Sequence, residues 1–195
     1  MTRRPAAAEL GLLLAPGAGA GRDQPALVAI DRRASEAGAE VVRMDFPYRK
    51  AGRRSPDRPA VLLAAVTEEA GALRRRVARL VLGGRSMGGR ICSMAVADGL
   101  ETDGLVLISY PLHPPGRPER RRDEHFPSLK VPCLFVSGTR DQFGSPEELV
   151  EATNDIPGPV THQWVEGKDH GLKGTDRVVS EMVLDWLVAN RFIGG

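Results

Sequence analysis

One serine lies in a short motif whose residue types suit nucleophilic catalysis. Residues 84–88 read Gly-Arg-Ser-Met-Gly and come just after the apolar run 80–82. Between a strand and a helix, a G-x-S-x-G sequence forms a nucleophile elbow, a sharp turn that raises the serine hydroxyl above the end of the strand. Glycines on either side of Ser86 leave room for that turn, and residues 91–97 have a helical pattern. We predict that Ser86 is a nucleophile, with a glycine-rich turn of no catalytic role as the alternative.

A serine hydroxyl is a weak nucleophile at neutral pH, so it needs a neighbouring base and a carboxylate that orients the base. After an elbow, the acid follows a later strand and the histidine lies on a loop near the end of the chain. We therefore predict Asp141, which follows the apolar run 132–137, as the acid, and His170, in the loop after the last predicted strand, as the base. Asp169 is the alternative acid, although side chains adjacent in sequence rarely meet in the required geometry. The other histidines lie inside a loop, at the wrong end of a strand or ahead of the acid: His125, His162 and His113.

Acyl transfer also requires two N–H donors directed at the oxyanion that develops on the substrate. The backbone N–H of Met87, at the start of a predicted helix, is one candidate donor. The second candidate is the N–H of Ala18, in the loop Pro16-Gly17-Ala18-Gly19 after the first predicted strand. A phosphate-binding loop is the competing interpretation, but the chain lacks the G-x-G-x-x-G pattern and the Lys-Ser/Thr ending there. By their loop positions, further residues are expected near the substrate pocket: Arg85, Met87, Tyr48, His113 and Phe143.

Short apolar runs alternate with helical periodicity along the whole chain, which is typical of a parallel sheet covered by helices on both faces. Strands are predicted at 10–15, 40–46, 80–84, 105–109, 132–137 and 161–165. Helices are predicted at 24–37, 60–78, 87–98, 146–153 and 176–193, with loops at 47–58 and 110–129. The expected fold class is α/β, a single domain over residues 1–195 with a mostly parallel sheet of about six strands. In such sheets the site lies beyond the carboxyl ends of the strands.

Composition limits the classes of partner. The chain has 195 residues and a formal net charge of +2, which gives no reason to expect a nucleic acid or a membrane as partner. The basic and acidic residues within 117–124 are interpreted as solvated surface. The run 10–15 is shorter than the apolar region of a secretory signal, so we interpret it as a strand and expect a cytoplasmic protein. Cys92 and Cys133 lie in apolar patterns, as buried thiols of a reducing compartment do.

Taken together, these motifs resemble the α/β-hydrolases, and more narrowly the small dienelactone-hydrolase-like branch that includes testis-expressed protein 30. The resemblance implies a Ser86–His170–Asp141 triad that uses no metal and no organic cofactor. Two features depart from the family: Pro16 stands where many members have histidine, and the chain has no insertion long enough for a lid domain, so the site should be open. The resemblance rests on Pro16-Gly17-Ala18-Gly19, Phe46-Pro47-Tyr48-Arg49, Gly83-Gly84-Arg85-Ser86-Met87-Gly88-Gly89-Arg90, Tyr110-Pro111-Leu112-His113-Pro114-Pro115-Gly116, Gly138-Thr139-Arg140-Asp141 and Asp169-His170.

The function expected from these residues is hydrolysis of a small ester, thioester or activated acyl compound through an acyl-enzyme. A scaffold or regulatory module that keeps the fold without useful turnover is the alternative, because fold and motif do not establish flux. The sequence defines neither the substrate nor the oligomeric state.

Overall fold

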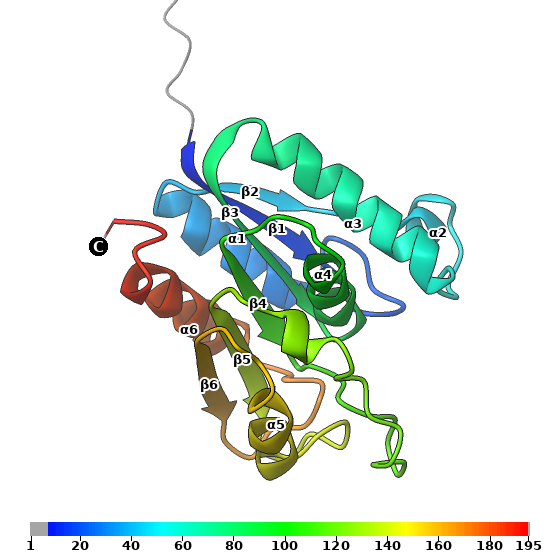
Figure 1. The fold of residues 1–195 in the computed structure, drawn as a ribbon. Coiled ribbons are helices and arrows are strands. Elements are labelled where there is room, and N and C mark those ends of the chain that lie inside the picture. Colours follow the sequence, from blue (N-terminus) through cyan, green and yellow to red (C-terminus); the bar gives the residue numbers. More distant parts are fainter. Residues whose placement is uncertain (1–7, 195) are drawn as a thin grey trace, which may run out of the picture.

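A computed structural model describes residues 8–194 of the chain. Its centre is a sheet of six strands in the order β2-β1-β3-β4-β5-β6 (Figure 1). All five neighbouring pairs are parallel, so the sheet is parallel throughout rather than mostly so. The strands are β1 (Ala8–Ala15), β2 (Glu40–Arg43), β3 (Val77–Arg85), β4 (Gly104–Ile108), β5 (Cys133–Gly138) and β6 (Val160–Val165).

Helices cover both faces of this sheet (Figure 1). They are α1 (Pro25–Glu36), α2 (Pro47–Lys50), α3 (Pro59–Arg74), α4 (Met87–Ala97), α5 (Pro146–Thr153) and α6 (Asp176–Ala189). Side chains of β1 alternate between the two faces, as successive residues of a strand do. Leu10, Leu12 and Leu14 pack with residues of α1 and α6, whereas Leu13 and Ala15 pack with residues of α3 and α4. The continuous apolar strands are thus explained by burial on both faces.

Several element boundaries differ from the sequence-based prediction. The predicted strand 40–46 ends at Arg43, and the predicted loop 47–58 begins with the short helix α2. Pro47 starts that helix, since its fixed φ suits the first helical position and its missing N–H costs nothing there. The predicted helix 60–78 ends at Arg74 because the chain joins the sheet at Val77, which pairs with Ala8. Within the predicted loop 110–129, a 3₁₀ turn forms at Phe126–Ser128.

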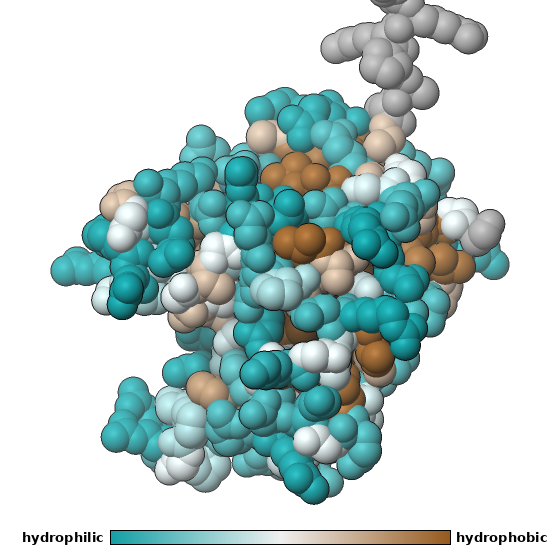
Figure 2. All heavy atoms as spheres, turned by 180° about the vertical axis from the view of Figure 1, so that it is seen from behind, coloured by the Kyte–Doolittle hydropathy of each residue, from teal (hydrophilic) through white to brown (hydrophobic). Residues whose placement is uncertain are grey.

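All strands run in the same direction, so the loops that follow β1, β3, β5 and β6 lie together beyond the carboxyl ends of the strands. These loops carry the predicted triad and oxyanion residues. The face shown in Figure 2 is mainly hydrophilic, with small separate hydrophobic patches. Among residues 8–194, no helix is long and apolar enough to cross a lipid bilayer.

Candidate active site

Ser86 lies at a sharp turn between β3 and α4 and has a backbone conformation that serines rarely adopt. Its φ is +50° and its ψ is −118°. A Cβ on Gly84 would come 2.6 Å from the backbone carbon of Gly88, and one on Gly88 would collide with the carbonyl oxygen of Ala15. The two glycines of the motif are therefore required by close backbone contacts. The turn is held by a 2.8 Å hydrogen bond from the N–H of Ser86 to the carbonyl of Ile108 on β4.

Three side chains predicted to act together form a continuous hydrogen-bonded chain. The Nε2 atom of His170 lies 2.8 Å from the Oγ of Ser86. On the other side of the ring, Nδ1 lies 2.8 Å from Oδ2 and 3.0 Å from Oδ1 of Asp141. Ser86 follows β3, Asp141 follows β5 and His170 follows β6, so three separate strand ends supply the group.

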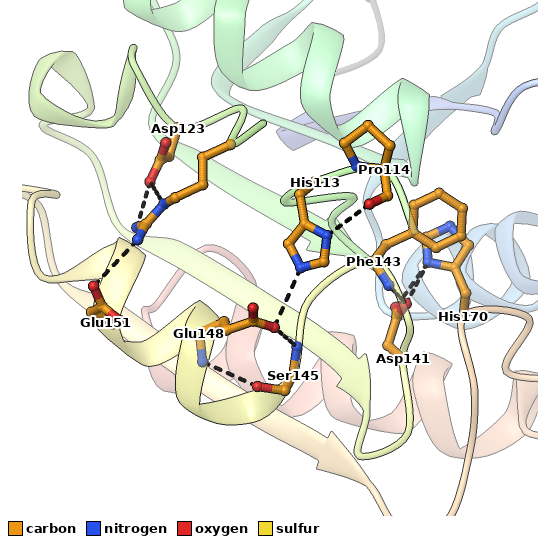
Figure 3. A network of polar contacts seen from close by, with 10 residues as sticks. His113, Pro114, Asp123, Asp141, Phe143, Ser145, Glu148, Glu151 and His170 are labelled. Atoms are coloured by element: carbon orange, nitrogen blue, oxygen red, sulfur yellow. Dashed lines mark hydrogen bonds and ion pairs between the residues drawn. The ribbon is translucent and has the colours of Figure 1, made fainter. Parts of the chain in front are cut away.

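Burial and packing hold the carboxylate and the imidazole in place. The side chain of Asp141 has 0% of its surface exposed, compared with 14% for His170. The N–H of Phe143 donates a 2.8 Å hydrogen bond to Oδ1 of Asp141. The Phe143 ring lies on the imidazole, with 4.1 Å between the ring centroids (Figure 3). The imidazole is thus held at its edge by the carboxylate and at its face by the phenyl ring.

The alternative acid, Asp169, forms no hydrogen bond or ion pair with the imidazole within residues 8–194. Its Oδ1 accepts a 2.9 Å hydrogen bond from the N–H of Gly171 and so shapes the loop that carries His170. The same loop is tied to the elbow by Arg85, whose guanidinium donates to the carbonyls of His170 at 2.6 Å and Gly171 at 2.8 Å. Burial lowers the pKa of Arg85, and the charge of Asp141 opposes that effect.

The loop after β1 leaves one N–H for the cavity and uses the two beside it for its own support. The N–H of Gly17 donates to Oε1 of Gln24 at 3.0 Å, and the N–H of Gly19 donates to the hydroxyl of Tyr48 at 3.3 Å. Within residues 8–194, the N–H groups of Ala18 and Met87 make no hydrogen bond outside helices and strands, and both residues line the cavity at Ser86. Their placement suits two donors to an oxyanion.

A cavity of about 430 Å³ opens over Ser86. Three of its lining residues were missed by sequence reasoning: Arg90, Pro111 and Arg122. Arg90 lies one helical turn after the serine, which is a signal in the sequence, whereas Arg122 belongs to the cluster interpreted as solvated surface. That interpretation is wrong for Arg122, because its side chain is half-buried and lines the cavity. The lining residues are Gly17, Ala18, Arg85, Ser86, Met87, Arg90, Pro111, Arg122, Phe143 and His170.

Two residues expected near the pocket do not line this cavity. Tyr48 is fully buried in the core under α3, and its hydroxyl supports Gly19 instead of facing substrate. His113 follows β4, but its ring turns toward the start of α5 (Figure 3). There its Nδ1 lies 2.9 Å from the carbonyl of Pro114, and its Nε2 lies 3.3 Å from Oε2 of Glu148.

A second serine–histidine pair lacks the features of a nucleophile. The Oγ of Ser93 lies 2.8 Å from Nε2 of His125, but Ser93 has 0% exposure and its hydroxyl donates to the carbonyl of Arg90. No carboxylate within residues 8–194 is hydrogen-bonded to His125.

Neither cysteine is a candidate nucleophile. Burial raises the pKa of both cysteines, Cys92 and Cys133, to about 12, so neither is a thiolate at neutral pH. In the described part of the chain, no group of three His, Cys, Asp or Glu side chains could hold a metal ion.

The fold and this cluster of side chains define a hydrolase of the α/β class. The chain belongs to the alpha/beta hydrolase domain family, whose model matches residues 8–187.

Solved structures share the fold at low sequence identity. Est1E from Butyrivibrio proteoclasticus is 15% identical, with a TM-score of 0.78 over 97% of this chain and 90% of that one. An alpha-beta serine hydrolase homologue from Coxiella burnetii is 20% identical, with a TM-score of 0.73 over 92% and 85%. A monoacylglycerol lipase from Paleococcus ferrophilus is 15% identical, with a TM-score of 0.75 over 92% and 94%.

Proposed function

We propose that this protein is a serine hydrolase that cleaves a small ester, thioester or activated acyl compound through an acyl-enzyme. The observation that supports the proposal most strongly is the hydrogen-bonded chain from Ser86 through His170 to the buried Asp141. That chain ends at a cavity, so a substrate carbonyl can reach the serine oxygen. The narrower placement in the dienelactone-hydrolase-like branch is part of the same proposal.

In the proposed mechanism, the Oγ of Ser86 attacks the substrate carbonyl while its proton passes to Nε2 of His170. The imidazolium donates its Nδ1–H to Asp141, which stabilises the positive charge. The oxyanion accepts hydrogen bonds from the N–H groups of Ala18 and Met87, the latter at the positive end of the α4 dipole. The leaving group takes the proton from Nε2 as the carbonyl re-forms, and the acyl group stays on the serine. Water then releases the acid by the same two steps.

The cavity favours small substrates. Its volume of about 430 Å³ lies near the lower end of the range for ligand pockets, and its apolar contacts come mainly from Met87, Pro111 and Phe143. A long acyl chain would have little apolar surface to bind, so the preferred acyl group should be short. Both cysteines are free and buried, as suits a reducing compartment, and we place the activity in the cytoplasm.

A fluorophosphonate probe tests the nucleophile without knowledge of the substrate. The wild-type protein should be labelled once per chain, and peptide mass analysis should place the label on Ser86. Ser86→Ala should not be labelled, although its melting temperature should equal that of the wild type. Ser93→Ala is the matched control, because it removes the other serine that is paired with a histidine, and it should be labelled as the wild type is. An unlabelled wild-type protein would contradict the proposal and favour a scaffold role.

A further inference from the structure

Of the three arginines that line the cavity over Ser86, two have guanidinium groups that the described part of the protein leaves largely without acceptors. Arg90 is on the second turn of α4, and Arg122 is on the loop between β4 and β5; both are half-buried. Within residues 8–194, the side chain of Arg90 forms no hydrogen bond or ion pair, and its buried Nε has no partner. In the same residues, the side chain of Arg122 makes one hydrogen bond, at 3.4 Å to the carbonyl of Pro111. Guanidinium groups that lose water without gaining an acceptor are costly.

Several other partly buried arginines of the protein are compensated by carboxylates. Arg33 pairs with Glu181 at 2.8 Å and Arg43 pairs with Asp31 at 2.7 Å. Arg121, the neighbour of Arg122 in sequence, pairs with Asp123 at 2.6 Å. Carboxylates thus compensate partly buried arginines at several places in the fold, and neither Arg90 nor Arg122 has such a carboxylate within the described residues.

The electrostatic surroundings of the cavity are positive. Its lining contains three arginines and no aspartate or glutamate, and Asp141 is screened behind His170 with none of its side chain exposed. Burial, and secondarily the charge of Arg90, lowers the pKa of Arg122. Arg85 is engaged with the His170 loop, so Arg90 and Arg122 are the cations left to meet a ligand.

We propose that Arg90 and Arg122 form an anion subsite, and that the substrate is an acyl compound with a carboxylate or phosphate group that reaches these guanidiniums within the same cavity. This inference rests on the proposed serine hydrolase function. Guanidinium groups bind both oxyanions through paired N–H donors, and a ligand anion would satisfy the donors that the protein leaves unpaired. Substrates without the anion would leave both charges uncompensated in the enzyme–substrate complex.

Matched ester pairs test the subsite and show which half of the substrate carries the anion. In the acyl half, monophenyl adipate is compared with phenyl hexanoate; in the leaving group, 4-acetoxybenzoate and 4-acetoxyphenyl phosphate are compared with phenyl acetate. We expect kcat/KM to favour the anionic member of at least one pair by about tenfold or more, the low end for charged hydrogen bonds because the cavity is open. The preference should fall as salt rises from about 20 to about 500 mM.

The arginine variants decide whether the preference comes from the subsite. Arg90→Gln and Arg122→Gln should each reduce the anionic-to-neutral ratio of kcat/KM by about tenfold. Arg120→Gln is the matched control, because Arg120 is exposed on the same loop and does not line the cavity, and it should keep the wild-type ratio. A ratio near one in every pair, or a preference unchanged by both substitutions, would overturn the proposal.

A binding measurement separates this proposal from the serine hydrolase function. If no ester is hydrolysed, the proposed function fails, and the subsite is then tested by calorimetric titration of Ser86→Ala with monophenyl adipate. Salt-sensitive binding that disappears in Ser86→Ala/Arg122→Gln supports the subsite even then. No heat of binding to Ser86→Ala, or equal binding to both proteins, refutes it.

Discussion

Asp141→Asn should stop catalysis by reversing the hydrogen bond on which the base depends. The N–H of Phe143 donates to Oδ1, so the amide oxygen of an asparagine would occupy that place. The amide NH₂ would then replace Oδ2, which lies 2.8 Å from Nδ1 of His170. Facing a donor, Nδ1 must become an acceptor, and the ring proton moves to Nε2. In that tautomer Nε2 cannot take the proton of Ser86.

The size of the effect follows from losing the correct tautomer while keeping the geometry. Loss of this carboxylate in a serine–histidine–aspartate site lowers kcat by about 10⁴-fold, which corresponds to about 5.4 kcal/mol of activation free energy. The second-order rate of fluorophosphonate labelling and kcat on phenyl acetate should both fall, while the melting temperature stays close to that of the wild type because the side chains have the same shape.

Asp169→Asn is the matched control for this substitution. Asp169 is adjacent to His170 in the sequence, but among the described residues its side chain accepts a hydrogen bond only from the N–H of Gly171. Its loss should therefore lower kcat by less than about tenfold. Comparable losses in the two variants, or a loss below tenfold for Asp141→Asn, would refute the assignment of Asp141 as the orienting acid.

Three further predictions concern the support of the site. Tyr48→Phe leaves the N–H of Gly19 without its acceptor. We expect the free energy of unfolding to fall by about 1 kcal/mol and kcat to fall several-fold with little change in KM. An unchanged kcat would contradict the idea that Tyr48 holds the oxyanion loop in place. Gly88→Ala should destabilise the fold by more than about 3 kcal/mol in denaturant unfolding because its Cβ meets backbone. Gly71→Ala is the control, since Gly71 lies in a helix and a Cβ there would meet only the end of the Arg75 side chain at 4.0 Å; it should stabilise the fold by about 0.5–1 kcal/mol. Burial, and secondarily the charge of Arg90, lowers the pKa of His125. The stability that neutral His125 contributes is therefore present above the unfolded pKa of about 6.5 and is lost as pH falls. The drop in melting temperature between pH 7.5 and 5 should be smaller in His125→Gln than in the wild type, and an equal drop in the two proteins would contradict this.

The sequence predicted the six strands and the relation of Ser86, Asp141 and His170 because these depend on short-range patterns. Apolar runs mark strands, and a parallel sheet brings the residues after each strand to one edge. Side-chain direction within a loop is not encoded in this way. Position alone placed His113 at the pocket, but its ring turns to the start of α5, where Glu148 accepts from it.

Boundaries and long-range contacts were also beyond the sequence pattern. Whether residues after Arg74 continue a helix or join the sheet depends on pairing between Val77 and Ala8, far away along the chain. The role of Arg122 depends on how a long loop without periodicity folds over the cavity. The sequence pattern therefore assigned both neighbouring arginines to the solvated surface. Among the described residues, Arg121 forms ion pairs with carboxylates, whereas Arg122 forms none.

The position of β6 has a consequence for how activity is lost on heating. In the part of the chain that the structure describes, β6 is the last strand of the sheet and pairs with β5 alone. Such outer strands open locally at a lower free energy than central ones. The loop after β6 carries His170, whereas Ser86 follows the central strand β3. Local opening of the edge would therefore separate the base from the nucleophile while most of the sheet stayed intact, and Arg85 opposes that opening by fastening the base loop to the elbow.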